Sequence, residues 1–410
     1  MLFKKIKFFA LCLSVSLFCG EASATDAVEE LQASLEAWRE QGVDLGLTHK
    51  SDVLAVADGG LKRGLGWLGH SEARLDLDLD KLLDWNSTHL YLHYHSDLGS
   101  KFNSEHVGAV VGVDNIEVAT NTAQFYQAWL QKSFIDDRLS ILAGLYAIDS
   151  EFYLTQASAL FIQPPYGMAN EVAVSGQAGP PIFPLGALAM RVKYASHERH
   201  FYLMAAVSDG VPGNPNKPHG TQIKLGQGDG LLSIMELGYQ PQHGTHDQEE
   251  KGERPWINKT AVGWWRYSAP LDVLDDATRR AHASGAYLLS EQTLWREAAQ
   301  PSAGLDGFMR FGMADASTNS LDWTASMGVR YQGLIAGRHD DVAGVAVTVN
   351  HASSHQQATA SKETNFEASY QYRLRSWLIL QPTIQYILQP GLTSGIENAW
   401  LLGLRTELAI

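Results

Sequence analysis

The stretch HSEARLDLDLD, residues 70–80, alternates strictly between polar side chains and small or apolar ones. The polar positions are His70, Glu72, Arg74, Asp76, Asp78 and Asp80. Strict alternation is typical of a β-strand, because successive side chains point to opposite faces of a sheet. We therefore expect a strand with one wet face and one apolar face.

A calcium-binding loop is the alternative interpretation of three aspartates spaced two residues apart. Such a loop also needs a glycine at its sixth position, for a sharp turn, and a glutamate at its twelfth. Counted from Asp76, these positions are occupied by Lys81 and Ser87. Both requirements fail, so the strand is the favoured interpretation.

Residues 1–24 have the composition of a secretory signal peptide. Three lysines precede an almost wholly apolar stretch, residues 8–19, and residues 22–24 (ASA) suit cleavage after position 24. Both cysteines, Cys12 and Cys19, lie in this segment, so we expect a mature chain without thiols. Such a chain has no disulfides, cysteine nucleophiles or thiolate metal sites.

The formal net charge of −14 argues against nucleic acid as a partner. No run of about 18 apolar residues follows the leader, which argues against a membrane-spanning helix. Residues 26–41 (DAVEELQASLEAWREQ) have helical apolar spacing and end before a glycine. We expect a helical segment over 25–42, either a periplasmic helix or a plug, followed by one β-domain over 43–410.

The alternation seen in residues 70–80 recurs through the β-domain. It is clear in residues 139–146, 187–194, 201–207, 322–332, 343–350, 378–386 and 402–410. Tight turns, such as that at Asp136 and Asp137, separate some strands, and longer connections, such as 209–228 and 240–258, separate others. We expect the short turns at one end of the sheet and these long loops at the other.

A soluble β-sandwich also shows alternation, with its polar face in water. Aromatic residues at or near strand ends favour a transmembrane barrel, where they form girdles at the two membrane interfaces. These residues are Tyr194, Phe201, Tyr331, Tyr372, Trp377, Tyr386 and Trp400. At roughly 20 to 25 residues per strand and connection, the domain has room for about 16 to 18 strands, enough for a water-filled lumen. The predicted fold class is all-β, a transmembrane antiparallel β-barrel with a short N-terminal helix.

Several ordered stretches of the sequence resemble one known family. They include LDLDLDKLLDW from Leu75, SFIDDRLSILAGLY from Ser133, SEFYLTQASALFI from Ser150, GPPIFPLGALAMRVKY from Gly179, GLDGFMRFGMAD from Gly304, GRHDDVAGVAV from Gly337 and WLILQPTIQYILQPG from Trp377. The chain resembles the carbohydrate-selective outer-membrane porins, the OprB family, from about Gly42 onward. The resemblance implies a sixteen-stranded monomer in the outer membrane of a Gram-negative bacterium, surrounded by lipid, that passes mono- or oligosaccharides by facilitated diffusion.

The resemblance also implies no catalysis and no cofactor. Barrels of this class usually end in an aromatic residue that the barrel assembly machinery recognises, whereas this sequence ends in Ile410. The assembly machinery remains an expected partner, because Ile410 is hydrophobic and in the right phase.

Sugars in a narrow wet pore need charged donors and acceptors that replace lost water. The candidate pore-lining residues are Glu72, Arg74, Asp76, Asp78, Arg191, Lys193 and Arg330 on strands, with Arg373 and Arg405 elsewhere on the wall. Residues 150–170 are too long and apolar for a solvated loop, so we expect them to fold into the barrel and offer Glu151 to the sugar. Any water-filled barrel needs a polar interior, however, so simple lining is the competing explanation for each charge.

Histidines at positions 89, 93 and 95 share one strand face with Tyr91. Two imidazoles on one face can share a metal, but a further ligand from another strand is needed, so lumen lining is the favoured role. The turn at residues 339–341 (HDD) could contribute to a triad, although a turn role is favoured.

Motifs for enzymatic activity lack their context. The sequence has no G-x-S-x-G, H-E-x-x-H or P-loop motif. One G-x-G-x-x-G, residues 64–69, leads into a strand and not into a helix, unlike a dinucleotide site. A nonspecific general porin remains the main alternative function, with an outer-membrane hydrolase as the alternative from another class.

Overall fold

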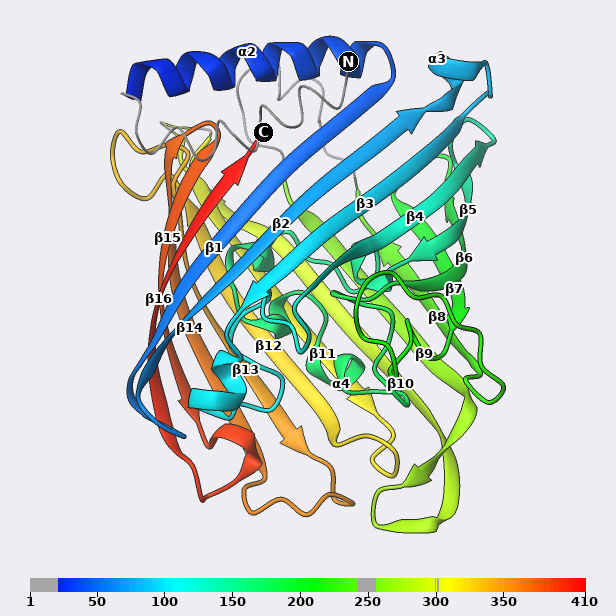
Figure 1. Cartoon of the computed structure of the whole chain (residues 1–410), viewed down its shortest axis with the longest axis vertical. Coiled ribbons are helices and arrows are strands. Elements are labelled where there is room, and N and C mark those ends of the chain that lie inside the picture. The colour runs from blue at the N-terminus through cyan, green and yellow to red at the C-terminus, as the bar shows by residue number, and fades with distance from the viewer. Residues whose placement is uncertain (1–20, 242–255, 299, 301) are drawn as a thin grey trace.

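The computed structural model describes residues 21–241, 256–298, 300 and 302–410. In these residues sixteen antiparallel strands form one closed barrel, in which the first strand also pairs with the last (Figure 1). Every strand hydrogen-bonds its neighbours in the sequence. The prediction of an all-β barrel with about 16 strands is confirmed.

The strands are β1 (Val43–Gly60), β2 (Gly64–Asp78), β3 (Thr88–Gly99), β4 (Thr122–Phe134), β5 (Leu139–Tyr146), β6 (Ala187–Ala195), β7 (Phe201–Asp209), β8 (Leu231–Tyr239), β9 (Asn258–Val273), β10 (Asp276–Arg296), β11 (Gly304–Ala314), β12 (Leu321–Gln332), β13 (Val342–Ala352), β14 (Lys362–Arg375), β15 (Leu378–Leu388) and β16 (Glu397–Ala409). The helices and short helical turns are α2 (Glu21–Glu40), α3 (Leu79–Leu83), η1 (Asn103–Val107), η2 (Ile148–Ser150), η3 (Ala157–Leu160), η4 (Pro164–Tyr166), α4 (Asn170–Ala173) and η5 (Pro390–Leu392).

The strand predicted over residues 70–80 is real but shorter than expected. β2 ends at Asp78, and Asp80 lies in the first turn of α3. The Asp78 carboxylate accepts hydrogen bonds from the backbone N–H groups of Asp80 (3.1 Å) and Lys81 (3.3 Å). An aspartate that caps a helix in this way stops the strand, although the alternation of the sequence continues.

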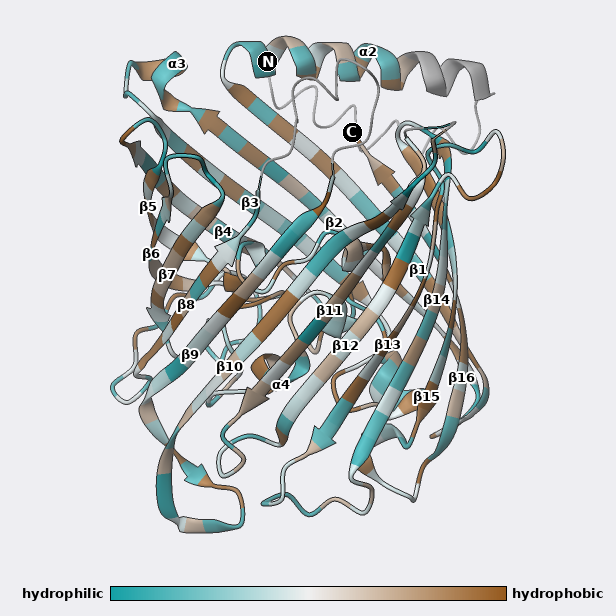
Figure 2. Ribbon diagram, turned by 180° about the vertical axis from the view of Figure 1, so that it is seen from behind, coloured by the Kyte–Doolittle hydropathy of each residue, from teal (hydrophilic) through white to brown (hydrophobic). Residues whose placement is uncertain are grey.

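The outer face of the barrel carries a belt of exposed apolar side chains. Leu65 is 69% exposed, and large apolar residues of the other strands are also exposed, among them Met190, Val262, Met327, Val345 and Leu402. Figure 2 shows the resulting alternation of hydrophobic and hydrophilic residues along the strands. A soluble protein does not expose so much apolar surface, so the belt faces lipid. None of the helices in the described part of the chain is long and apolar enough to cross a membrane.

The two ends of the barrel differ. One end, here called the turn end, carries the chain's C-terminus, helix α2 and tight connections such as residues 135–138 (Figure 1). The opposite end, the loop end, carries the long connections 100–121, 147–186 and 210–230. Outer-membrane barrels have short turns on the periplasmic side and long loops outside the cell, which orients the barrel.

One sequence expectation about these ends was wrong. Residues 209–228 and 240–258 were expected at the same end, but successive connections of an antiparallel barrel alternate between ends. The connection between β7 and β8 is therefore at the loop end, and that between β8 and β9 begins and finishes at the turn end. Both connections are long, and length alone does not reveal the end. Most of the second connection, residues 242–255, lies outside the described residues.

Helix α2 lies across the turn end of the barrel and not inside the lumen (Figure 1). The described helix begins at Glu21, earlier than the predicted start at residue 26, and Arg39 in its last turn pairs with Asp44 of β1 at 3.1 Å. The plug is thus the alternative that the structure does not support. Residues 1–20 of the expected signal peptide lie outside the described residues.

The buried core of the protein lies inside the barrel. The loop of residues 147–186 folds inward, as expected for residues 150–170, and its apolar side chains pack against the wall. The largest cluster joins loop residues such as Phe152 and Tyr153 to wall residues such as Trp265 and Tyr287. This inward segment, called the constriction loop below, fills part of the lumen and leaves a narrower path.

Candidate functional site

Three inward-facing glutamates of the wall hold the backbone of the constriction loop. Glu236 of β8 accepts a hydrogen bond from the N–H of Tyr153 at 2.9 Å. Glu291 of β10 accepts one from the N–H of Ala157 at 2.9 Å. Glu367 of β14 accepts two, from Ile162 (2.8 Å) and Gln163 (3.0 Å). Because a short irregular loop cannot pair its own N–H groups, these carboxylates satisfy donors that would otherwise be buried without partners.

Two cations of the wall hold the loop's carbonyl groups in the same manner. Arg310 of β11 donates to the carbonyls of Pro165 (3.1 Å), Tyr166 (2.8 Å) and Gly167 (2.6 Å). Lys259 of β9 donates to the Leu154 carbonyl at 2.8 Å. These buried charges fix the position of the loop and do not face the open pore.

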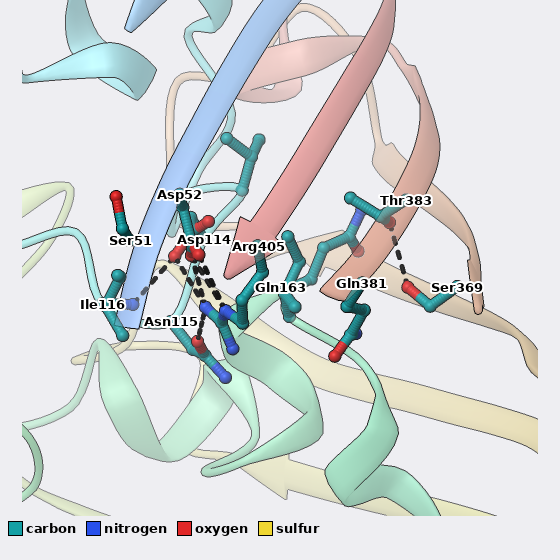
Figure 3. A network of polar contacts seen from close by, with 12 residues as sticks. Ser51, Asp52, Asp114, Asn115, Ile116, Gln163, Ser369, Gln381, Thr383 and Arg405 are labelled. Carbon is teal, nitrogen blue, oxygen red and sulfur yellow. Dashed lines mark hydrogen bonds and ion pairs between the residues drawn. The ribbon is translucent and has the colours of Figure 1, made fainter. Parts of the chain in front are cut away.

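The second inward loop, residues 100–121, is held at the seam between β1 and β16. Arg405 of β16 contacts Asp52 of β1, and also Asp114 (3.3 Å) and Asn115 (2.7 Å) of the loop (Figure 3). The N–H of Asn115 donates to the Ile162 carbonyl at 2.7 Å, which ties the two loops together. Arg405 was a sequence candidate for sugar contact, but the structure buries it in this network.

Glu151, predicted to face the pore, lies in the constriction loop beside two cations of β6. Arg191 Nε is 2.7 Å from its carboxylate, and Lys193 Nζ is 3.8 Å away. The two cations differ in burial: the side chain of Arg191 is 3% exposed and that of Lys193 is 42% exposed. Arg191 also donates to Ser140 and Gln131, at 2.6 Å each, so its role is to position Glu151.

A cavity of about 460 Å³ opens beside this group, lined by Glu151, Gln156, Lys193, Tyr202, Lys259 and Glu291 among others. Its size falls in the range of small-molecule sites. The lining places two amino groups, two carboxylates, an amide and a phenol within one space. Such a mixture offers both donors and acceptors to a solute covered with hydroxyl groups.

The other predicted residues lie on the inner face of the β2–β3 pair. Arg74 is half-exposed and 3.3 Å from Glu72, and Asp76 is 3.0 Å from His89. The carboxylate of Asp78 caps α3 and is used structurally. This wall therefore presents an exposed guanidinium and an exposed carboxylate to the lumen.

Arg330, on the β12 wall, is 3.1 Å from Asp306 of β11 and mostly buried. The structure thus brings Glu151, Arg191 and Lys193 together, and separately Glu72, Arg74 and Asp76. Arg330 belongs to neither group.

Sequence reasoning missed Glu236, Glu291, Glu367, Lys259 and Arg310, the residues that hold the constriction loop. A signal for Glu236 exists in the sequence. In residues 231–239 (LLSIMELGY) it shares the inward phase with Leu232 and Ile234, both buried. A charge in an otherwise apolar inward phase indicates a specific buried partner, since such a charge is costly when unpaired.

A closed barrel with an apolar belt, a polar lumen and inward loops that narrow it defines a channel of the porin class. The family model "Carbohydrate-selective porin, OprB family" matches residues 62–409, and the chain belongs to that family. The protein is therefore an outer-membrane channel of a Gram-negative bacterium and not an enzyme, and the hydrolase alternative is dropped.

Two curated relatives are similar over most of their length. Porin B of Pseudomonas aeruginosa is 22% identical over 416 residues, which cover 90% of this chain and 87% of the relative. The putative porin QuiX of Acinetobacter baylyi is 21% identical, with 81% of each chain covered.

Solved structures show the same fold. The high-pH structure of Pseudomonas putida OprB has a TM-score of 0.80 at 18% identity, and the match covers 93% of this chain and 97% of that one. The low-pH structure of the same protein has a TM-score of 0.58. At these identities the structural likeness establishes the fold alone.

Proposed function

We propose that this porin passes sugars by facilitated diffusion past the constriction loop, and that the cavity beside Glu151 and Lys193 is a contact site on the path. The observation that carries the proposal is the pairing of these two exposed, opposite charges at 3.8 Å within a cavity of about 460 Å³. Adjacent hydroxyl groups of a sugar can accept from the amino group and donate to the carboxylate at once.

The mixed sign of the charges favours neutral solutes. A ring of one sign attracts ions of the opposite sign, whereas paired opposite charges offer strong hydrogen bonds without a strong net field. Glu72, Arg74 and Asp76 supply the same combination on the β2–β3 wall. We assign Arg191 and Arg330 supporting roles and leave Asp78 out of the path. The whole path lies within one barrel, so a monomer suffices.

Planar-bilayer recording of the purified protein tests the proposal. We expect stepwise conductance that mono- or disaccharides reduce in a concentration-dependent manner. Lys193→Ala should weaken the sugar block while single-channel insertion continues. As a matched control, Lys132→Ala alters a lysine at the turn end that bonds the Asn86 carbonyl, and the block should stay unchanged. A steady current that no sugar affects would favour the nonspecific general porin instead.

A further inference from the structure

A compact group of histidine and carboxylate side chains lies on the inner face of β2 and β3, outside the proposed sugar cavity. It consists of His70, His95 and Asp97, and all three side chains are buried. One ring nitrogen of each histidine and one carboxylate oxygen lie within 4.8 Å of one another. The register explains the grouping, because His70 pairs directly with Asp97, and His95 is two residues from Asp97 on the same strand face.

The contacts inside this group are close but incompletely hydrogen-bonded. His70 Nδ1 is 2.7 Å from Asp97 Oδ1, and His95 Nδ1 is 2.8 Å from Asp97 Oδ2. Within the described part of the chain, neither ring nitrogen of His95 nor Oδ2 of Asp97 has a hydrogen-bond partner. Buried polar atoms are nearly always paired, so this exception requires an explanation. Two atoms this close without hydrogen-bond geometry are suited to share a third body, a cation between them.

A carboxylate is also placed to orient His70 from behind. Glu72 Oε2 is 3.4 Å from His70 Nε2, the nitrogen that does not face Asp97. Glu72 is itself held by His93 at 2.9 Å and Arg74 at 3.3 Å. Histidines that bind metals usually donate their other ring N–H to a carboxylate, which fixes the tautomer and turns the first nitrogen toward the ion.

Aromatic rings cover the group on its lumen side. Phe183 of the constriction loop lies 5.5 Å, between ring centroids, from both His70 and His95. Tyr126 of β4 lies 5.5 Å from His95. An apolar cover limits solvent access and strengthens the interaction of an ion with its ligands.

We propose that His70, His95 and Asp97 form a binding site for a divalent transition-metal ion of the zinc type, with Glu72 as the carboxylate that orients His70. Two imidazoles and one carboxylate form a ligand set for Zn²⁺, which takes nitrogen and oxygen ligands at about 2.0–2.2 Å. Ca²⁺ and Mg²⁺ prefer oxygen ligands only and are disfavoured here. A three-residue set leaves a fourth coordination position for water. The proposal is independent of sugar transport.

Metal titration of the full-length protein in detergent, after chelator treatment and dialysis, tests the site. Zn²⁺ binding is measured by calorimetry and by elemental analysis, and Co²⁺ serves as a spectroscopic probe of nitrogen ligation. We expect about one tight site per chain, weakened at least tenfold in His95→Ala and in Asp97→Asn. Glu72→Gln should weaken binding by roughly 10- to 100-fold, as is usual for a carboxylate behind a metal-binding histidine.

His89→Ala is the matched control, because His89 lies on the same face of β3 but contacts Asp76 and not the cluster. Its Zn²⁺ affinity should equal that of the unmodified chain. Heat-modifiable migration and circular dichroism identify variants that do not fold, and Asp97→Asn preserves the side-chain shape if His95→Ala fails this check. The proposal is overturned if the unmodified chain binds no Zn²⁺, or if His95→Ala and Asp97→Asn bind it as tightly as His89→Ala.

Discussion

Arg405 and Asp52 face each other across the seam of the barrel, where the last strand pairs with the first. Arg405 Nε lies 2.9 and 3.0 Å from the two carboxylate oxygens of Asp52, and a terminal nitrogen lies 2.6 Å from one of them (Figure 3). Both side chains are buried. The pair links barrel closure to the placement of an inward loop, because the same guanidinium also reaches Asp114 and Asn115.

Arg405→Ala should destabilise the barrel strongly. The substitution leaves the carboxylate of Asp52 buried without its partner, and breaking a buried ion pair from one side costs about 3–5 kcal/mol. The shift of the urea unfolding midpoint of protein refolded into lipid vesicles measures this. The double variant Asp52→Asn, Arg405→Gln should recover part of the loss, since it leaves no unpaired charge. Arg63→Ala breaks an exposed pair with Asp58 and should change the midpoint little.

Glu367→Ala should loosen the constriction loop. The N–H groups of Ile162 and Gln163 both lose their acceptor, and each unpaired buried donor costs about 1–3 kcal/mol. We expect a larger and noisier single-channel conductance together with weaker sugar block. The control is Glu397→Ala, an exposed glutamate at the start of β16, which should leave conductance unchanged. Equal conductance of Glu367→Ala and the unmodified channel would contradict the anchoring role.

The two cations beside Glu151 should respond differently to removal. Lys193→Ala should raise the half-blocking sugar concentration by about 2- to 10-fold, the equivalent of one net hydrogen bond of about 0.5–1.5 kcal/mol, without loss of stability. Arg191→Ala should lower the unfolding midpoint as well, because it releases Glu151, Ser140 and Gln131 together. If the Lys193 variant shows the greater loss of stability, the assignment of roles is reversed.

A pH effect is expected from the turn that precedes β13. Burial tends to raise the pKa of Asp341, but hydrogen bonds from Arg338 and Tyr370 and the nearby charge of Arg338 outweigh it and lower the pKa of this carboxyl. Arg338 donates to it at 2.7 and 2.8 Å, and the N–H of Arg373 at 3.0 Å. A group whose folded pKa is lowered contributes stability above its unfolded pKa of about 3.9, and this contribution is lost as the pH falls through the folded value.

Asp341→Asn should therefore destabilise the protein at pH 7 and have a progressively smaller effect as the pH falls below about 4. Unfolding midpoints of the variant and the unmodified chain across this range provide the measurement. A constant difference between the two at every pH would argue against an ionised, hydrogen-bonded Asp341. The same contacts confirm the turn role that the sequence favoured for residues 339–341.

The strands could be predicted from the sequence because each one carries its own evidence. The alternation in residues 70–78 and 187–194 depends on neighbouring residues only, and a lipid belt requires it of every strand. The roles of the lumen charges could not be predicted. Arg191 and Lys193 share a strand and a phase, yet only contacts with β4, β5 and the constriction loop distinguish the buried cation from the exposed one.

The limits of local evidence are also visible at residues 76–80. Three aspartates look equivalent in the sequence, but Asp76 contacts a histidine across the sheet, Asp78 caps a helix and Asp80 lies within it. The metal cluster is a similar case, because the histidine pattern on β3 is visible whereas its partner His70 depends on the register with β2.

The wall glutamates hold the constriction loop by its main chain, and every residue except proline has the same main-chain N–H. The side chains that this loop turns toward the cavity, such as Gln156, can therefore be exchanged without loss of the anchors at Glu236, Glu291 and Glu367. The frame and the recognition surface can vary separately in evolution. A lineage could adapt such a porin to a different nutrient through a few substitutions in the loop while the barrel stays the same.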